Sequence, residues 1–261
     1  MSSYTLKEIR DAYLQKRDWE KQFPINFFLI RPISFYLTFL ILKVTQNPAN
    51  IALFGFALGI IGCFFLACSQ IFSIWPGIIF IILYSLSDAV DGNVARTTKN
   101  VTLFGKYLDG IIGSLIDGNY FFFLGIGMYF LKDYRWVDRT LGWTPEQVGI
   151  LSLSLGGFIL ISKLWADIFK DRYESYKAKK EGLPKFDESK SSEPIGKSTF
   201  SRRWYFRLFI NMDCLNNQLL LLALLAILKL EVLFLIGFAC FYTLRSVFYC
   251  VFYFMRTKAA L

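Results

Sequence analysis

Apolar residues occur along this chain in six long runs that are separated by polar stretches. Each run approaches the roughly 20 residues that an α-helix needs to cross a bilayer. The runs lie at residues 50–68, 74–96, 104–131, 147–170, 209–230 and 232–254. We therefore predict an all-α integral membrane protein with six transmembrane helices, which places both ends of the chain on the same side of the membrane.

Two helical segments are expected before the first run. Residues 5–22 mix charged and apolar residues and predict an amphipathic helix at the membrane surface. Residues 32–42 are apolar but too short to cross a bilayer, so we expect them to be interfacial. Accordingly, we divide the chain into an N-terminal interfacial segment, residues 1–45, and a six-helix membrane domain, residues 46–261, with a polar cytoplasmic loop at 171–205.

The composition supports a membrane location and restricts the chemistry. Hydrophobic residues make up 55% of the chain and aromatic residues 18%. There is no histidine, which excludes Ser-His and Cys-His catalysis and imidazole metal sites. The five cysteines form no CxxC pair, so we expect reduced, packed thiols. Any chemistry must rely on carboxylates, Lys, Arg or Tyr.

The positive charge is unevenly distributed, and this asymmetry predicts the orientation. The net charge is +9, and Lys and Arg concentrate before the first run, between the second and third, and between the fourth and fifth. Because Lys and Arg prefer cytoplasmic loops, we expect these segments and both termini to be cytoplasmic. No basic domain or aromatic readout motif accompanies the charge, so nucleic acid is not an expected partner.

Three aspartates interrupt the apolar sequence. Asp88 and Asp91 lie near the cytoplasmic end of the second run, and Asp109 lies near the cytoplasmic start of the third. The three carboxylates therefore share a shallow layer, where leaving them unpaired would cost many kcal/mol. Because Mg²⁺ and Mn²⁺ prefer carboxylate and phosphate oxygens, the cluster predicts a divalent-metal site that acts on a phosphate-bearing substrate.

Two neighbouring residues extend this prediction. Gly92 leaves room for a ligand to approach the backbone, although close helix packing is an alternative explanation. Arg96 follows the acids at the membrane surface, where its guanidinium suits a substrate diphosphate. The alternative role for Arg96 is an interfacial positive-inside anchor.

The spacing Asp88-x2-Asp91-Gly92-x2-Ala95-Arg96-x8-Gly105-x3-Asp109 resembles the signature of the CDP-alcohol phosphotransferases, also called CDP-alcohol phosphatidyltransferases. Residues 47–50, Asn-Pro-Ala-Asn, loosely resemble the Pro-Asn entry to that family's first helix. The resemblance implies metal binding by the three aspartates and a CDP site lined by Gly92, Ala95, Arg96, Gly105 and Asn50. It also implies a homodimer in the lipid bilayer.

The activity implied by this resemblance is the transfer of a substituted phosphate group. A CDP-alcohol would donate the group to an acceptor hydroxyl in a metal-dependent reaction that releases CMP, as in phospholipid synthesis. The acceptor expected is a polyol, a sugar phosphate or an amino alcohol. Arg202, Arg203 and Arg207 favour a phosphorylated acceptor, although a charge run is more often a solvated face.

One position departs from the family pattern. Four residues after its third aspartate, the family has a fourth that ligates metal and serves as general base, and this chain has Gly113 there. Asp117, one turn further along, is the candidate substitute base. Two interpretations stay open: an active enzyme with a displaced base, or a CDP-binding member with weak or no activity.

Other charged residues lie at membrane depth and offer a different role for Asp117. Arg245 in the sixth run lies at a similar depth, and a buried charge needs a partner. We favour an Asp117–Arg245 ion pair over the catalytic role. Lys163 and Asp167 are spaced i, i+4, which predicts a second ion pair within one helix.

Two other classes of membrane protein also bury acids. An ion-coupled transporter is disfavoured because the chain has no internal repeat and its acids lie near one surface rather than at the midplane. A prenyltransferase with an aspartate-rich motif would not require Gly92, Ala95 and Arg96 in register. Release of CMP from a CDP-alcohol distinguishes the favoured activity from both.

Overall fold

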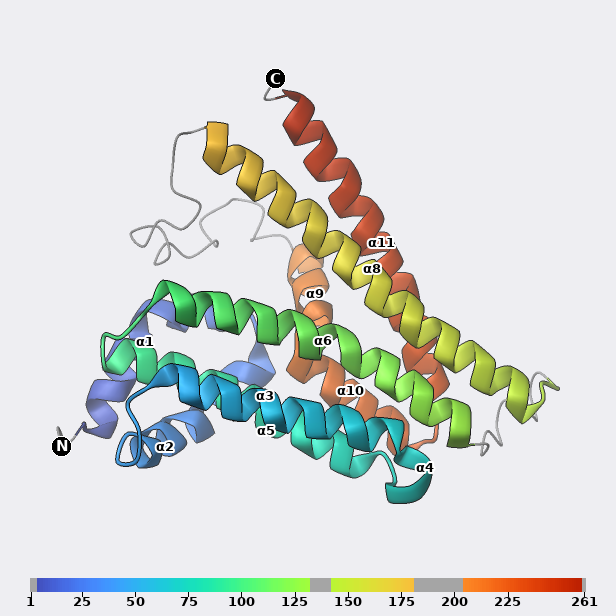
Figure 1. Ribbon diagram of the computed structural model, residues 1–261, viewed down its shortest axis with the longest axis horizontal. Helices are drawn as coiled ribbons and strands as arrows, with labels where there is room; N and C mark the ends of the chain where they lie inside the picture. Colours follow the sequence, from blue (N-terminus) through green and yellow to red (C-terminus); the bar gives the residue numbers. More distant parts are fainter. Residues whose placement is uncertain (1–3, 132–141, 181–203, 260–261) are drawn as a thin grey trace. The chain divides into compact units, whose positions relative to one another are not determined.

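A computed structural model describes residues 4–131, 142–180 and 204–259 (Figure 1). Every regular element in these ranges is helical. The helices are α1 (Leu6–Glu20), η1 (Asn26–Ile30), α2 (Arg31–Ile41), α3 (Pro48–Ala67), α4 (Ser69–Phe72), α5 (Trp75–Thr97), α6 (Leu103–Leu131), α8 (Pro145–Lys180), α9 (Trp204–Asp213), α10 (Leu215–Ile227) and α11 (Glu231–Ala259). The predicted all-α class is confirmed for the described part of the chain.

Within the described ranges, five helices are long and apolar enough to cross a membrane: α3, α5, α6, α8 and α11. They correspond to five of the six predicted spans. The other, residues 209–230, is not one continuous helix, because α9 and α10 are separated at Cys214. These five long apolar helices, with the shorter pair α9 and α10, are those of an integral membrane protein.

Polar side chains explain the break between α9 and α10. The Asn217 amide donates to the backbone carbonyl of Asn211 at 2.9 Å, and the Gln218 amide donates to that of Met212 at 2.7 Å. Side chains that bond nearby carbonyls compete with the helical backbone ladder. Averaged hydropathy hides this local competition, so the sequence pattern predicted an uninterrupted span.

The N-terminal helix is present close to the predicted residues. It begins after Thr5, whose side chain accepts from the Glu8 N–H while the Glu8 carboxylate accepts from the Thr5 N–H, a capping box. Ile9 and Tyr13 are buried, and the ring of Tyr13 packs against Phe35 with centroids 5.2 Å apart. Its interfacial position stays a prediction.

Helix α8 is longer than expected. The fourth span was predicted to end at residue 170, but the helix continues to Lys180 through charged sequence. No Gly or Pro interrupts residues 158–180, and Lys, Glu and Ala favour a helix. Residues 171–180 of the predicted polar loop are thus helical, while residues 181–203 lie outside the described ranges.

The chain divides into two compact units, which we describe separately. The first comprises residues 1–61, 78–113 and 188–221. Its core contains Ile9, Tyr13, Phe35, Leu42, Ile51, Val90 and Val94, contributed by α1, α2, α3 and α5. This unit contains all residues of the acid cluster.

The second unit comprises residues 62–77, 114–187 and 222–261. In it, α8 packs against α11 (Figure 1). Helices α6 and α8 approach so closely that a Cβ at Gly125 would lie 2.7 Å from the Ser152 carbonyl oxygen. A Cβ at Gly156 would lie 2.6 Å from the backbone carbonyl oxygen of Phe121. Glycine at these two positions therefore allows the backbones of the two helices to come into contact, as in many membrane bundles.

Candidate functional site

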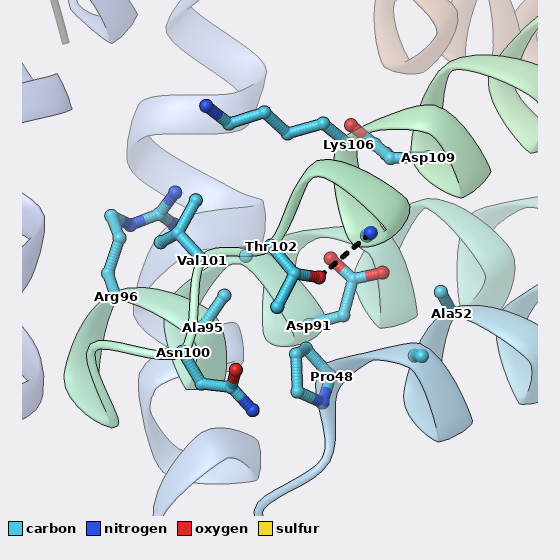
Figure 2. Close-up of a pocket in the computed structure, with 13 residues that line it drawn as sticks. Pro48, Ala52, Asp91, Ala95, Arg96, Asn100, Val101, Thr102, Lys106 and Asp109 are labelled. Atoms are coloured by element: carbon cyan, nitrogen blue, oxygen red, sulfur yellow. Dashed lines mark hydrogen bonds between the residues drawn. The ribbon is translucent and has the colours of Figure 1, made fainter. Parts of the chain in front are cut away.

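The site is built around the turn between α5 and α6. Helix α5 ends at Thr97. Two residues later Lys99 adopts the left-handed region, at φ 55°, and the Asn100 N–H donates to the Ala95 carbonyl at 2.9 Å. This pattern terminates a helix and redirects the chain. Helix α6 then starts at once, because the Thr102 hydroxyl accepts from the Gly105 N–H at 3.0 Å (Figure 2). The turn brings the last turns of α5 close to the first turn of α6.

A cavity of about 310 Å³ lies at this turn and reaches the start of α3 (Figure 2). Its lining residues are Pro48, Ala49 and Ala52 from α3, Asp91, Gly92, Ala95 and Arg96 from α5, Asn100, Val101 and Thr102 from the turn, and Gly105, Lys106 and Asp109 from α6. Six of the eight predicted metal and CDP residues therefore line one cavity.

Asp88 lies in a small adjoining cavity of about 10 Å³. That cavity shares Ala52, Asp91 and Asp109 with the larger one, so the three aspartates come together around connected space. Asp88 and Asp109 are exposed and Asp91 is half-buried. Their carboxylates come from two different helices, as the shared depth predicted.

Charges of both signs face the larger cavity. Asp91 and Asp109 supply carboxylates, and Arg96 and Lys106 supply cations from the two sides of the turn (Figure 2). Carboxylates suit a divalent cation, whereas a guanidinium and an ammonium suit phosphate oxygens. Lys106 was not singled out from the sequence, although its position within one turn of Asp109 was a signal for a role in the site.

Arg96 is held in place by its own helix. Its Nη2 donates to the Asn93 side-chain oxygen at 2.9 Å. Its guanidinium covers Gly92, where a Cβ would lie 3.2 Å from both Nη1 and Nη2. The absence of a side chain at Gly92 thus gives room to Arg96, which is a more specific role than either explanation offered by the sequence.

The donor set fits a hard divalent cation in chemistry. Asp88, Asp91 and Asp109 are oxygen donors on connected cavities, and carboxylates with substrate phosphates and water are the usual ligands of Mg²⁺. Across the described residues, however, no three His, Cys, Asp or Glu side chains are already grouped as a metal-binding set. The described side chains therefore provide the donor type without a closed all-protein cage.

The position of the missing fourth aspartate is open. A Cβ built at Gly113 would meet nothing within 4 Å. Asp117 lines neither of these two cavities and belongs to the second unit, where its carboxylate lies 3.8 Å from the Lys163 ammonium. Lys163 also donates to the Asp117 carbonyl at 3.0 Å.

One of the predicted ion pairs needs correction. Asp117 has a cationic partner, as expected, and Lys163 is one such partner. The predicted pair of Asp117 with Arg245 stays a prediction. Lys163 is not paired with Asp167 of its own helix; Asp167 instead accepts from Arg245 at 3.3 Å. Both side chains of α8 reach across to neighbouring helices, and spacing within one helix does not predict that direction.

Asn50 is not part of the cavity at the α5–α6 turn. Its side-chain oxygen accepts from Asn47 at 3.5 Å, and it lines a separate apolar cavity of about 410 Å³ between α2, α3 and α5. Pro48, Ala49 and Ala52 represent α3 at the site instead. Among the predicted acceptor residues, Arg202 and Arg203 lie outside the described residues, and Arg207 belongs to α9.

Two further polar residues of the site carried only weak signals in the sequence. Thr102 directly precedes an apolar run, which is typical of a helix N-cap. Asn93 lies between the acids and Arg96, and nothing in the sequence distinguishes it from an exposed helix residue. Its burial and its bond to Arg96 identify it.

Comparison with known families explains the spacing of the acids. Residues 45–167 match the family model described as CDP-alcohol phosphatidyltransferase. The match starts just before α3 and ends within α8, so it includes every residue that lines the two cavities. Comparison with curated proteins gives no match. The resemblance inferred from the sequence, to the CDP-alcohol phosphatidyltransferases, is confirmed by this match over residues 45–167.

Proposed function

We propose that this protein binds a CDP-alcohol in the cavity at the α5–α6 turn and transfers its substituted phosphate group to an acceptor hydroxyl. The observation that carries the proposal is the grouping of Asp91, Asp109, Arg96 and Lys106 around one cavity inside the family-matched region. The same cavity provides both a carboxylate cluster and two phosphate-binding cations.

The proposed ligands of Mg²⁺ or Mn²⁺ are Asp88, Asp91 and Asp109. A bound cation supplies charge neutralisation and Lewis-acid polarisation of the diphosphate. Arg96 and Lys106 hold the diphosphate by charge-assisted hydrogen bonds. The small side chain of Ala95, with Gly105, leaves space for the nucleotide beside the backbone.

In the proposed reaction the acceptor oxygen attacks the β-phosphorus of the CDP-alcohol. A new P–O bond forms, the bond from the β-phosphorus to the CMP oxygen breaks, and CMP leaves with the electron pair. The acceptor loses its proton in the same step. With glycine at position 113, that proton passes to water, or to Asp117 if that residue serves as the substitute base.

Gly113 also favours a second candidate function, which is CDP binding with little turnover. A positioned general base typically contributes 10²–10⁴-fold to a rate. Glycine at the position of the family's base therefore supports slow catalysis. Asp117, the substitute base expected from the sequence, stays a proposal, and its ion pair with Lys163 supports a structural role instead.

Nucleotide binding is tested by titrating the purified protein with CDP in Mg²⁺ or Mn²⁺. We expect Asp91→Asn to weaken metal-dependent CDP binding at least a hundredfold. Asp18→Asn is the matched control. Asp18 is an exposed carboxylate on α1, and it forms an ion pair with Lys21, the residue that follows this helix. Equal CDP affinity of native protein and Asp91→Asn would refute the proposed site.

A further inference from the structure

A buried polar network joins the N-terminal segment to the candidate site. Arg31, the first residue of α2, is only 7% exposed. Its guanidinium forms a two-pronged ion pair with Glu20 of α1 and lies over the ring of Tyr13 at 5.2 Å. The Tyr13 hydroxyl donates to the same Glu20 carboxylate at 2.7 Å.

The free side of Arg31 reaches α5. Its Nη1 donates to the Ala89 carbonyl and to the Asn93 side-chain oxygen, both at 3.2 Å. Asn93 is 2% exposed, and its oxygen also accepts from Arg96 at 2.9 Å. One amide oxygen therefore receives hydrogen bonds from two guanidinium groups.

The orientation of this amide is fixed at its other end. The Asn93 nitrogen donates to the Ser34 hydroxyl at 3.0 Å and to the Thr38 hydroxyl at 3.3 Å, and both hydroxyls are fully buried. Rotating the amide would direct its NH₂ group at two guanidinium groups that only donate. Asn93 thus has one favourable orientation, which presents its oxygen to Arg96.

Electrostatics links Glu20 to the same arrangement. Two guanidinium groups on one acceptor repel each other, and Glu20 supplies the negative charge that offsets this repulsion. Without Asn93, Arg96 would lose the hydrogen bond that keeps its guanidinium over Gly92, and without Glu20 the repulsion from Arg31 would weaken that bond. The charge of Arg96 would then be free to leave the cavity.

We propose that Arg31 and Asn93 are positioning residues, which hold the Arg96 guanidinium where it meets the diphosphate of the nucleotide. This inference rests on the proposed function, because it gives Arg96 a nucleotide to bind. It assigns the N-terminal segment, which lies outside the family-matched region, a part in substrate binding.

The test measures CDP affinity in Mg²⁺ together with thermal stability. Asn93→Leu removes the shared acceptor at nearly constant size, and Arg31→Met removes the first guanidinium. We expect each to weaken CDP binding about tenfold. Asn216→Leu is the matched control: Asn216 is also a buried amide of the first unit and donates to Asn26 at 2.7 Å, but it does not line the cavity. It should lower stability and leave CDP affinity unchanged.

A double-mutant cycle separates positioning from a purely structural role. On an Arg96→Ala background, Asn93→Leu should weaken CDP binding no further, because its effect passes through Arg96. Additive losses, or an Asn93→Leu variant of native CDP affinity and lowered stability, would overturn the proposal. If Arg31→Met does not fold, the Asn93 cycle decides. If the native chain itself does not bind CDP, the proposed function is refuted. If the native chain binds CDP and the variants bind it equally well, only the positioning role is refuted.

Discussion

Single residues define the shape of the cavity, and the contact between Gly92 and Arg96 is the clearest example. Glycine at position 92 leaves the space that the guanidinium occupies. The sequence predicted the importance of Gly92 and Arg96, because the motif fixes their spacing on one helix. It did not predict their direct contact, since hydrophobic patterning does not define side-chain conformation.

We predict that Gly92→Ala displaces Arg96 and weakens CDP binding about tenfold. The added methyl group would meet only the end of a flexible side chain, so stability should change by less than about 1 kcal/mol. Calorimetric CDP titration and thermal melting measure the two effects. Gly237→Ala is the control, because its Cβ would meet nothing within 4 Å and it lies on α11. An unchanged CDP affinity in Gly92→Ala would contradict the role of this contact.

Asp117 provides a second prediction at this scale. Asp117→Asn weakens the ion pair with the buried Lys163, so we expect a loss of about 1–3 kcal/mol in the free energy of unfolding with CDP affinity retained. Denaturant or thermal unfolding in detergent measures the loss. Removing both charges with Lys163→Met should recover part of it. Selective loss of CMP release at native stability would instead identify Asp117 as the base.

At the scale of elements, packing determined what the sequence pattern missed. Long apolar runs predicted α3, α5, α6, α8 and α11 because hydropathy over about 20 residues is a strong signal. The break at Cys214 depends on side-chain bonds to carbonyls, which such an average does not contain. The site was predictable where it is local to the α5–α6 turn. The contribution of α3 was not predictable: Ala52 lines the cavity, whereas the expected Asn50 lines another one.

The buried polar network that links α1, α2 and α5 should weaken in acid, because it depends on the ionised Glu20 carboxylate. Burial alone would raise the pKa of this carboxyl, but the hydrogen bond and charge of Arg31, with Lys16 and Tyr13, outweigh it and lower the pKa below 4.5. A lowered folded pKa stabilises the protein above the unfolded value, and this stability is lost as pH falls through the folded pKa. The network should therefore be intact at pH 5 and above and weaken below about pH 4.5.

Thermal unfolding from pH 7 to pH 3 tests this prediction. At pH 7, Glu20→Gln should be less stable than native protein by up to about 3–5 kcal/mol, because Arg31 loses its buried counter-charge. The difference between the two proteins should shrink below about pH 4.5. If the difference in stability between the two proteins stays constant across this pH range, ionised Glu20 does not stabilise the network.

For the whole molecule, the number of crossings decides where the termini lie. Five long helices alone would place the termini on opposite sides, whereas a crossing made jointly by α9 and α10 returns them to the same side. The N-terminal segment carries Lys7, Arg10, Lys16 and Arg17, which favours the cytoplasm. The expected homodimer likewise stays a prediction at this scale.

We predict that both termini are cytoplasmic. Reporter fusions that are active on only one side of the membrane, attached in turn at each end, should give the same cytoplasmic result. A cytoplasmic N-terminus with an external C-terminus would mean that α9 and α10 do not cross together. The site at the α5–α6 turn should in either case share the side of the N-terminus, because α3 and α5 are two crossings.

The proposed CDP-alcohol transfer is tested most directly by CMP release from CDP-alcohols, measured for the native chain and for Gly113→Asp with Mg²⁺ or Mn²⁺ present. The open space at Gly113 accommodates the new side chain. We predict that both proteins bind CDP and that Gly113→Asp releases CMP about 10²–10⁴ times faster, since it regains a positioned base. Absence of both CDP binding and CMP release from the two proteins would contradict the assignment of this cavity to CDP-alcohol transfer.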